Sequence, residues 1–287
     1  MTSPPHGRPE RADTPEVAAL RRLKLTQPEL VTAIDMQIEV LILHRRMQGR
    51  VSTPWIDLDV DRVAQQLAAG TPVIRFEDIP FDWTELRILF RQLVDLLRRF
   101  EAVDQPDYEA LQRMVRASRP QPAEVAAWWS GSAVRPTPSP SDGAVDTAAY
   151  AQVLTLAARP FVARAAQSVQ QRVDVTAWQR PQCPFCLGDP ELGLLTVAGD
   201  RHLICGRCTG SWPFDAGTCP FCDNRNPACT TSFTSQDGRY RLTACDVCRR
   251  YLKSYDARGA DRPVMLDVDT IATLPLDAAA MQRGYTG

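Results

Sequence analysis

All nine cysteines of this 287-residue chain lie between Cys183 and Cys248, and the first 182 residues contain none. Eight of them form four C-x-x-C pairs, separated by 18, 10 and 22 residues. A C-x-x-C turn can direct two thiolates at one ion, and two such turns about 15 to 20 residues apart complete a tetrahedral four-sulfur site. The sequence therefore predicts two metal sites, site 1 made by Cys183, Cys186, Cys205 and Cys208 and site 2 by Cys219, Cys222, Cys245 and Cys248.

The tetrad Cys-Pro-Phe-Cys occurs twice, at 183–186 and 219–222, and it could instead be a redox dithiol. A thioredoxin-like dithiol needs a strand-to-helix turn inside a βαβ unit, whereas the first tetrad follows a helical segment and precedes no helix-forming stretch. We therefore favour metal ligation. Sequential pairing of the C-x-x-C units closes short loops at low entropic cost, although a crossed arrangement of the first unit with the third is an alternative.

The type of metal is left open by the ligands. Four thiolates in a tetrahedron suit zinc or a single rubredoxin-like iron, and the softness of the ligands does not choose between them. Zinc would make a site purely structural, whereas iron would add one-electron chemistry. The ninth cysteine, Cys229, has no C-x-x-C partner and is expected to be a structural or exposed thiol.

The chain divides into three parts by composition. Residues 1–27 are polar and proline-containing and are expected to be a disordered tail. Residues 28–180 show helical periodicity and predict an α-helical domain with a Pro/Ser/Gly linker at about 130–145. Residues 181–287 are glycine-punctuated and β-prone. The expected fold is therefore α plus small β: an N-terminal all-α domain, two tandem rubredoxin-like or zinc-ribbon-like knuckle modules, and a C-terminal helix.

Individual helices are predicted by apolar spacing and by their caps. In the strongest, Asp82 is the expected N-cap and Glu85 completes a capping box. Pro160 is expected to kink or split the helical segment from Asp146 to Trp178. The other helices are expected at 28–51, 59–70, 106–117, 122–129 and 267–283. His44 and the Trp128–Trp129 pair are expected to be packing residues.

Charge and hydropathy argue against several classes of protein. The net charge is −1, and residues 181–287 carry 11 basic against 12 acidic residues, so a nucleic-acid-binding module is disfavoured. No apolar run is long enough for a membrane span, and no hydrophobic signal segment begins the sequence. A cytoplasmic location is therefore expected. No catalytic triad, phosphate-binding loop or pair of carboxylates stands out, so we expect a protein that is not an enzyme.

The cysteine region resembles the formate dehydrogenase accessory proteins, FdhE. The similarity lies in "CPFCLGDPE", "GDRHLICGRCTGSW", the second "CPFC" and "CDVCRRYLKSYD", and the closing "DTIATLPLDAAAMQRGY" is also similar. More loosely, "IPFDWTELRILFRQLVDLL" and Trp178 resemble the helical domain of that family. The resemblance implies a cytosolic protein with two rubredoxin-like centres that hold iron, with zinc as the alternative. It also implies a partner, the catalytic subunit of a formate dehydrogenase, which needs the accessory protein to become active.

Two positions depart from the family pattern. Leu187 stands where the family usually has glycine, and Ala216 stands where it tends to have arginine. Two other functions are kept as alternatives, a rubredoxin-type electron-transfer partner and a zinc-ribbon nucleic-acid-binding protein. Metal-dependent folding is expected to be confined to residues 181–287. The candidate contacts with a client are the knuckle residues, unless they pack within the protein: Pro184, Phe185, Pro220 and Phe221.

Overall fold

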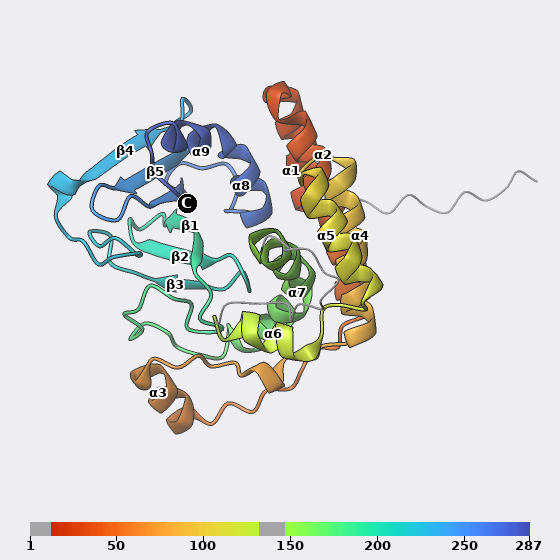
Figure 1. Ribbon diagram of the computed structural model, residues 1–287. Coiled ribbons are helices and arrows are strands. Elements are labelled where there is room, and N and C mark those ends of the chain that lie inside the picture. The colour runs from red at the N-terminus through yellow and green to blue at the C-terminus, as the bar shows by residue number, and fades with distance from the viewer. Residues whose placement is uncertain (1–12, 132–146) are drawn as a thin grey trace, which may run out of the picture.

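The computed structural model of this chain describes residues 13–131 and 147–287. Helices form its N-terminal part, and one six-stranded sheet with two short helices forms its C-terminal part (Figure 1). The α-helices are α1 (Pro15–Thr26), α2 (Val31–Gln48), α3 (Val60–Ala69), α4 (Trp83–Arg99), α5 (Gln105–Arg116), α6 (Pro122–Trp129), α7 (Thr147–Val169), α8 (Leu266–Ala272) and α9 (Leu274–Met281). The strands are β1 (Pro190–Leu195), β2 (Arg201–Cys205), β3 (Ser211–Pro213), β4 (Thr230–Thr234), β5 (Tyr240–Cys245) and β6 (Tyr251–Asp256). Short 3-10 turns lie at Pro28–Leu30, Phe76–Asp78 and Pro227–Cys229.

The helical core is built around α4, which contacts α2, α5 and α7. Its apolar stripe is fully buried, and each large side chain removed from water stabilises the fold by about 1.5–3 kcal/mol. The expected N-cap is confirmed, because the Asp82 carboxylate accepts the amide N–H groups of Thr84 and Glu85 at 2.9 and 3.0 Å. The predicted capping box was wrong, because the Glu85 carboxylate accepts from the Arg50 guanidinium at 2.9 Å instead.

Helix α7 is shorter than its sequence pattern suggests. It continues through Pro160 without being split and ends at Val169, whereas the pattern predicted helix as far as Trp178. The difference has a local cause: Trp178 turns into the core, where its indole N–H donates to the carbonyl of Gln182 at 2.7 Å. That contact requires the chain to leave the helix before the first knuckle.

The expectation of a disordered tail was wrong for residues 15–26, which form α1. Thr14 caps this helix by accepting the amide N–H of Val17 at 3.3 Å, and Pro15 occupies its first turn. Leu20 is fully buried in a cluster with Ile34 and Val268, so tertiary packing on α2 and α8 holds the helix. Residues 1–12 and most of the expected linker at about 130–145 lie outside the described residues.

The sheet has the strand order β3-β2-β1-β6-β5-β4. All neighbouring strands are antiparallel except β1 and β6, which pair in parallel. The sheet therefore consists of two three-stranded halves, one following each Cys-Pro-Phe-Cys tetrad, joined along the β1–β6 seam. Gly193 lies on this seam opposite Ser254, and a Cβ at that position would lie 2.4 Å from the Ser254 hydroxyl oxygen. A larger residue at position 193 would therefore force the Ser254 side chain to shift.

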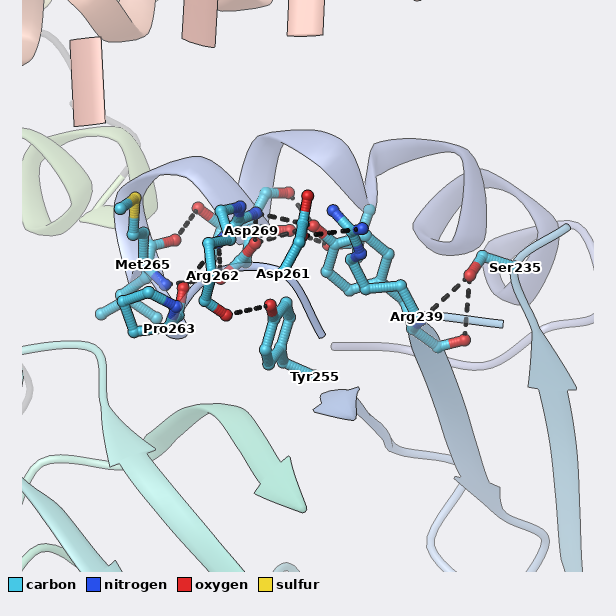
Figure 2. A network of polar contacts seen from close by, with 12 residues as sticks. Ser235, Arg239, Tyr255, Asp261, Arg262, Pro263, Met265 and Asp269 are labelled. Atoms are coloured by element: carbon cyan, nitrogen blue, oxygen red, sulfur yellow. Dashed lines mark hydrogen bonds and ion pairs between the residues drawn. The ribbon is translucent and has the colours of Figure 1, made fainter. Parts of the chain in front are cut away.

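The C-terminal segment forms two helices where one was expected, because Pro275 at the start of α9 cannot donate a backbone N–H. A polar network anchors α8 to the sheet (Figure 2). The fully buried Asp269 carboxylate accepts from the Tyr240 hydroxyl at 2.7 Å, from the Met265 amide at 2.6 Å and from the Arg262 guanidinium. Tyr255 in turn donates to the Arg262 carbonyl at 2.7 Å.

The predicted fold class is confirmed: a helical N-terminal region precedes a sheet that carries two knuckle clusters, and helices close the chain. The two parts share a core, because Phe161 of α7 belongs to the same buried cluster as Phe185, Leu203 and Trp212. Within the described residues, no helix combines the length and the apolar character needed to span a bilayer.

Candidate metal centres

The four C-x-x-C knuckles repeat one backbone design. In each, the amide of the first cysteine donates to the carbonyl five residues later, and the amide four residues later donates back to that cysteine's carbonyl. All eight bonds measure between 2.8 and 3.0 Å. The residue after the second cysteine is left-handed in every knuckle, with φ between 55° and 62°: Leu187, Thr209, Asp223 and Arg249. This conformation was indicated at Leu187, where the family usually has glycine, because glycine adopts a left-handed backbone at a lower energetic cost than other residues.

The first cluster brings together Cys183, Cys186, Cys205 and Cys208, all buried. The Sγ atoms of Cys183 and Cys208 lie 3.5 Å apart, as do those of Cys186 and Cys205. Four sulfurs about 2.3 Å from a central ion would lie about 3.8 Å from one another, whereas disulfide sulfurs lie about 2.05 Å apart. The donor set and its spacing therefore fit a tetrahedral metal ion.

The second cluster brings together Cys219, Cys222, Cys245 and Cys248 with similar spacing. Its Sγ atoms lie 3.8 Å apart for Cys219 and Cys248 and 3.6 Å apart for Cys222 and Cys245. Exposure distinguishes it from the first cluster, because Cys222 is exposed and only Cys245 is buried. Both clusters could hold a metal ion, and both pair the knuckles sequentially, as the sequence analysis favoured.

Backbone amides support the sulfur atoms of the first cluster. Gly188 donates to Cys186 Sγ at 3.4 Å, Arg207 to Cys205 Sγ at 3.3 Å and Gly210 to Cys208 Sγ at 3.4 Å. An N–H group that points at sulfur stabilises the thiolate over the thiol. The turns are thus arranged to present charged ligands.

The thiol pKa values show how the clusters behave without an ion. Burial raises the pKa of Cys183 and Cys208 well above the ordinary range. Burial also raises the pKa of Cys219, to about 12. Although burial acts in the same direction on Cys245, amide groups of Cys248 and Val247 lower its pKa to about 7. An incoming ion must therefore displace protons from several thiols, and its affinity falls as the pH falls.

The first cluster is fastened to the helical part from two sides. The amides of Val73 and Ile74 donate to the carbonyls of Pro184 and Phe185 at 2.9 and 3.1 Å, which holds the first knuckle. On the other side, Arg207 donates to the carbonyls of Trp128 and Trp129 at 3.3 and 3.0 Å, with its guanidinium carbon 4.4 Å from the Trp128 ring centre.

Arg159 of α7 adds a further attachment, donating to the carbonyl of Gly206 at 2.6 and 2.9 Å and to the Asp267 carboxylate at 2.8 Å. Sequence reasoning missed both Arg159 and Arg207. Nothing in the cysteine spacing identifies them, because their partners are backbone carbonyls and, for Arg159, the Asp267 carboxylate, all remote in sequence.

The knuckle residues expected to contact a client are mostly unavailable for that role. Pro184 and Pro220 are buried, and Phe185 is 1% exposed in the main core. Phe221 is half-buried, with the Arg250 guanidinium carbon 3.8 Å from its ring centre. The expectation of client contacts is therefore wrong for Pro184, Phe185 and Pro220, because these residues are buried within the protein.

Other residues singled out in the sequence are packing residues, as expected. His44 is buried, and its Nε2 lies 2.9 Å from the Leu156 carbonyl. Trp128 is buried beside Trp129, with ring centres 6.5 Å apart. Cys229 lies outside both clusters, and its Sγ accepts from the Asn226 amide group at 3.4 Å.

Comparison with known proteins supports the resemblance stated from the motifs. No protein-family model matches the sequence. A protein named FdhE homolog from Serratia proteamaculans (strain 568) is 30% identical over 110 residues, which span 37% of this chain and only 35% of that relative. The crystal structure of the FdhE protein from Pseudomonas aeruginosa superposes with a TM-score of 0.62 at 19% identity, covering 94% of this chain and 90% of that one. The chain therefore resembles FdhE proteins, in sequence over 37% of its length and in fold over nearly all of it.

Proposed function

We propose that this protein is an accessory protein for the maturation of a formate dehydrogenase in the cytoplasm. In this proposal it binds the catalytic subunit, is needed for that subunit's activity and catalyses no metabolic reaction itself. The observation that carries the proposal is the presence of two complete four-cysteine clusters on a fold shared with an FdhE protein.

The proposal assigns metal to both clusters, with iron as the ion and zinc as the alternative. The ligands would be the eight cysteines of the clusters: Cys183, Cys186, Cys205, Cys208, Cys219, Cys222, Cys245 and Cys248. Iron in four thiolates would supply one-electron chemistry, whereas zinc would only hold the turns together. Metal analysis of anaerobically purified protein, together with its visible spectrum, distinguishes the two.

The function is tested by deleting the gene in its host and measuring formate oxidation. We expect activity to be lost and to return with the wild-type gene. Complementation with Cys→Ser pairs then tests each cluster, and Cys229→Ser is the matched control because that cysteine lies outside both. Unchanged activity in the deletion strain would remove the accessory role, and rescue by variants lacking both clusters would show that the metal is dispensable.

Binding to the client needs its own experiment. A tagged chain should retain the catalytic subunit of formate dehydrogenase during purification from the host. As a control for effects on expression, the gene deletion should not alter the amount of that subunit's transcript. If the tagged chain restores formate oxidation without ever retaining the subunit, direct binding is excluded while the accessory role stands.

One observation favours the electron-transfer alternative, namely the exposure of Cys222 in the second cluster. An exposed four-thiolate iron would lie close to a docked redox partner. This alternative requires iron and a reversible potential, so colourless and redox-silent protein that still rescues the deletion would eliminate it.

A further inference from the structure

The two clusters differ in burial although their knuckles share one backbone design. Every cysteine of the first cluster is at most 1% exposed. In the second cluster Cys222 is exposed, and Cys219 and Cys248 are partly exposed. Reagents and competing ligands reach a cysteine at a rate that depends on its exposure. The burial pattern therefore predicts different reactivities for two chemically identical sets of ligands.

The surroundings of the clusters differ in the same direction. The first cluster is attached to the helical part by Val73 and Ile74, in the loop after α3, and by its own Arg207, which donates to the end of α6, so opening it means separating the sheet from the helical part. The second cluster is surrounded mainly by its own half of the sheet and the C-terminal segment, and Arg201 of β2 also reaches it by donating to the Thr218 carbonyl. From the C-terminal segment, Tyr285 donates to the Asp246 carboxylate, and the Asp246 amide donates to the Cys229 carbonyl at 2.9 Å.

A cavity of about 340 Å³ adjoins the second cluster and has two of its ligands, Cys219 and Cys245, in its wall. That volume is at the small end of the range typical of ligand pockets. Arg201 and Arg250 also line it, together with the Phe221 ring, and no carboxylate does so among the lining residues. Two guanidinium groups offset the negative charge of a four-thiolate cluster and attract anions.

Arg250 is the more adaptable of the two arginines. The Arg201 guanidinium is committed to backbone carbonyls, donating to Thr218 at 2.9 Å and to Asp215 at 3.1 Å. The Arg250 guanidinium lies on the Phe221 ring, whereas the knuckle uses the Arg250 backbone: its carbonyl accepts the Cys245 amide at 2.8 Å, and its amide donates to the Cys248 sulfur. A change of the Arg250 side chain therefore alters the cavity and leaves the turn intact.

We propose that the second cluster is the reactive centre of the pair, exchanging its metal with small anionic ligands that enter this cavity, while the first cluster retains its metal as a structural brace. The inference rests on the metal assignment proposed above. On exchange, the ion passes to the anionic ligand, and the freed thiolates of higher pKa take up protons from water.

The test uses the full-length chain loaded with two equivalents of zinc, and the anionic chelator 4-(2-pyridylazo)resorcinol as both ligand and indicator. We expect zinc to be released in two kinetic phases of one equivalent each. The slow phase, from the first cluster, should be at least about tenfold slower than the fast one, because it requires the helix–sheet contacts to open. Cys222→Ser should remove the fast phase. Cys186→Ser, the matching position in the other tetrad, should remove the slow phase.

A second pair of variants keeps the test independent of any folding defect. Arg250→Gln should slow the fast phase with the anionic chelator by about threefold, but not with neutral 1,10-phenanthroline. Arg225→Gln removes a nearby charge outside the cavity and should change neither rate. Alkylation with N-ethylmaleimide and peptide mapping should label Cys219, Cys222, Cys245 and Cys248 before the cysteines of the first cluster.

The possible failures are distinguishable. Equal release rates, equal alkylation of both clusters, or loss of the fast phase in Cys186→Ser would overturn the inequivalence of the clusters. The same effect of Arg250→Gln and Arg225→Gln would overturn entry through the cavity. Fewer than two equivalents of bound metal in the wild-type chain would overturn the ligand assignment itself, and with it the metal-dependent part of the proposed function.

Discussion

Replacing Asp269 by asparagine tests whether the buried network of Figure 2 anchors α8 to the sheet. The Asp269 side chain is fully buried, and that of Arg262 is only 16% exposed. Asparagine has nearly the same shape but no charge, so it leaves the Arg262 guanidinium unpaired and turns an N–H₂ group toward one of the donors. Removing one partner of a buried ion pair costs about 3–5 kcal/mol. We expect about 3 kcal/mol here, since Arg262 retains some contact with water.

Asp261→Asn is the matched control. Asp261 belongs to the same polar region and pairs with Arg239 at 3.0 Å, but its side chain is 74% exposed. An exposed ion pair contributes about 0.2–1 kcal/mol, so this variant should lose less than about 1 kcal/mol. Both are measured by urea unfolding, with far-ultraviolet circular dichroism and tryptophan fluorescence as signals.

A double variant separates the charge from the shape. Arg262→Gln in the Asp269→Asn background should restore part of the lost stability, because it removes the unpaired buried charge. Equal losses in Asp269→Asn and Asp261→Asn, or no recovery in the double variant, would refute the reasoning that the buried ion pair holds the C-terminal helices.

Further predictions concern single residues and metal removal. Leu187→Gly should raise the free energy of unfolding by about 0.5 kcal/mol. Relief of the left-handed backbone, worth about 1–2 kcal/mol, outweighs the added freedom of the unfolded chain, worth about 0.4–1 kcal/mol. A lower thermal midpoint would contradict this. Burial, and after it the charge of Arg159, lowers the pKa of His44 from 6.5 to about 4. The unfolded chain therefore binds the proton at a higher pH than the folded one, and the free energy of unfolding falls by about 3 kcal/mol as the pH drops from 6.5 to 4. His44→Gln, which keeps a donor for the Leu156 carbonyl, should lack that share of the pH dependence in parallel urea titrations. Cys229→Ser should bind as much metal as the wild type in elemental analysis, and loss of one ion would disprove its place outside the clusters. The sequence predicted metal-dependent folding confined to residues 181–287, but the first cluster lies in the core that the helices share. Chelation should therefore lower the thermal midpoint of the helical signal as well as that of the sheet, and an unaffected helical transition would support the narrower expectation.

The local features of this protein could be predicted from its sequence. Helix α4 could be predicted from its apolar spacing and from Asp82, because both signals act within a few residues. The sequential grouping of the cysteines could be predicted for a similar reason: a hairpin of fixed length returns the second knuckle to the first. Metal ligands at C-x-x-C spacing are constrained by turn geometry, which depends little on the rest of the chain.

The way these features combine depends on long-range contacts and could not be predicted from the sequence pattern. Residues 15–26 read as a polar tail, but Leu20 finds partners on α2 and α8, and burial there outweighs a weak local preference. The parallel β1–β6 seam merges two local modules into one sheet, and a pairing between strands so far apart in sequence leaves no periodic signal. Likewise, two clusters with the same ligand spacing differ because Val73, Ile74 and Arg207 attach only the first to the helical part. Burial depends on segments remote in the chain, so the sequence pattern could not distinguish the enclosed cluster from the accessible one.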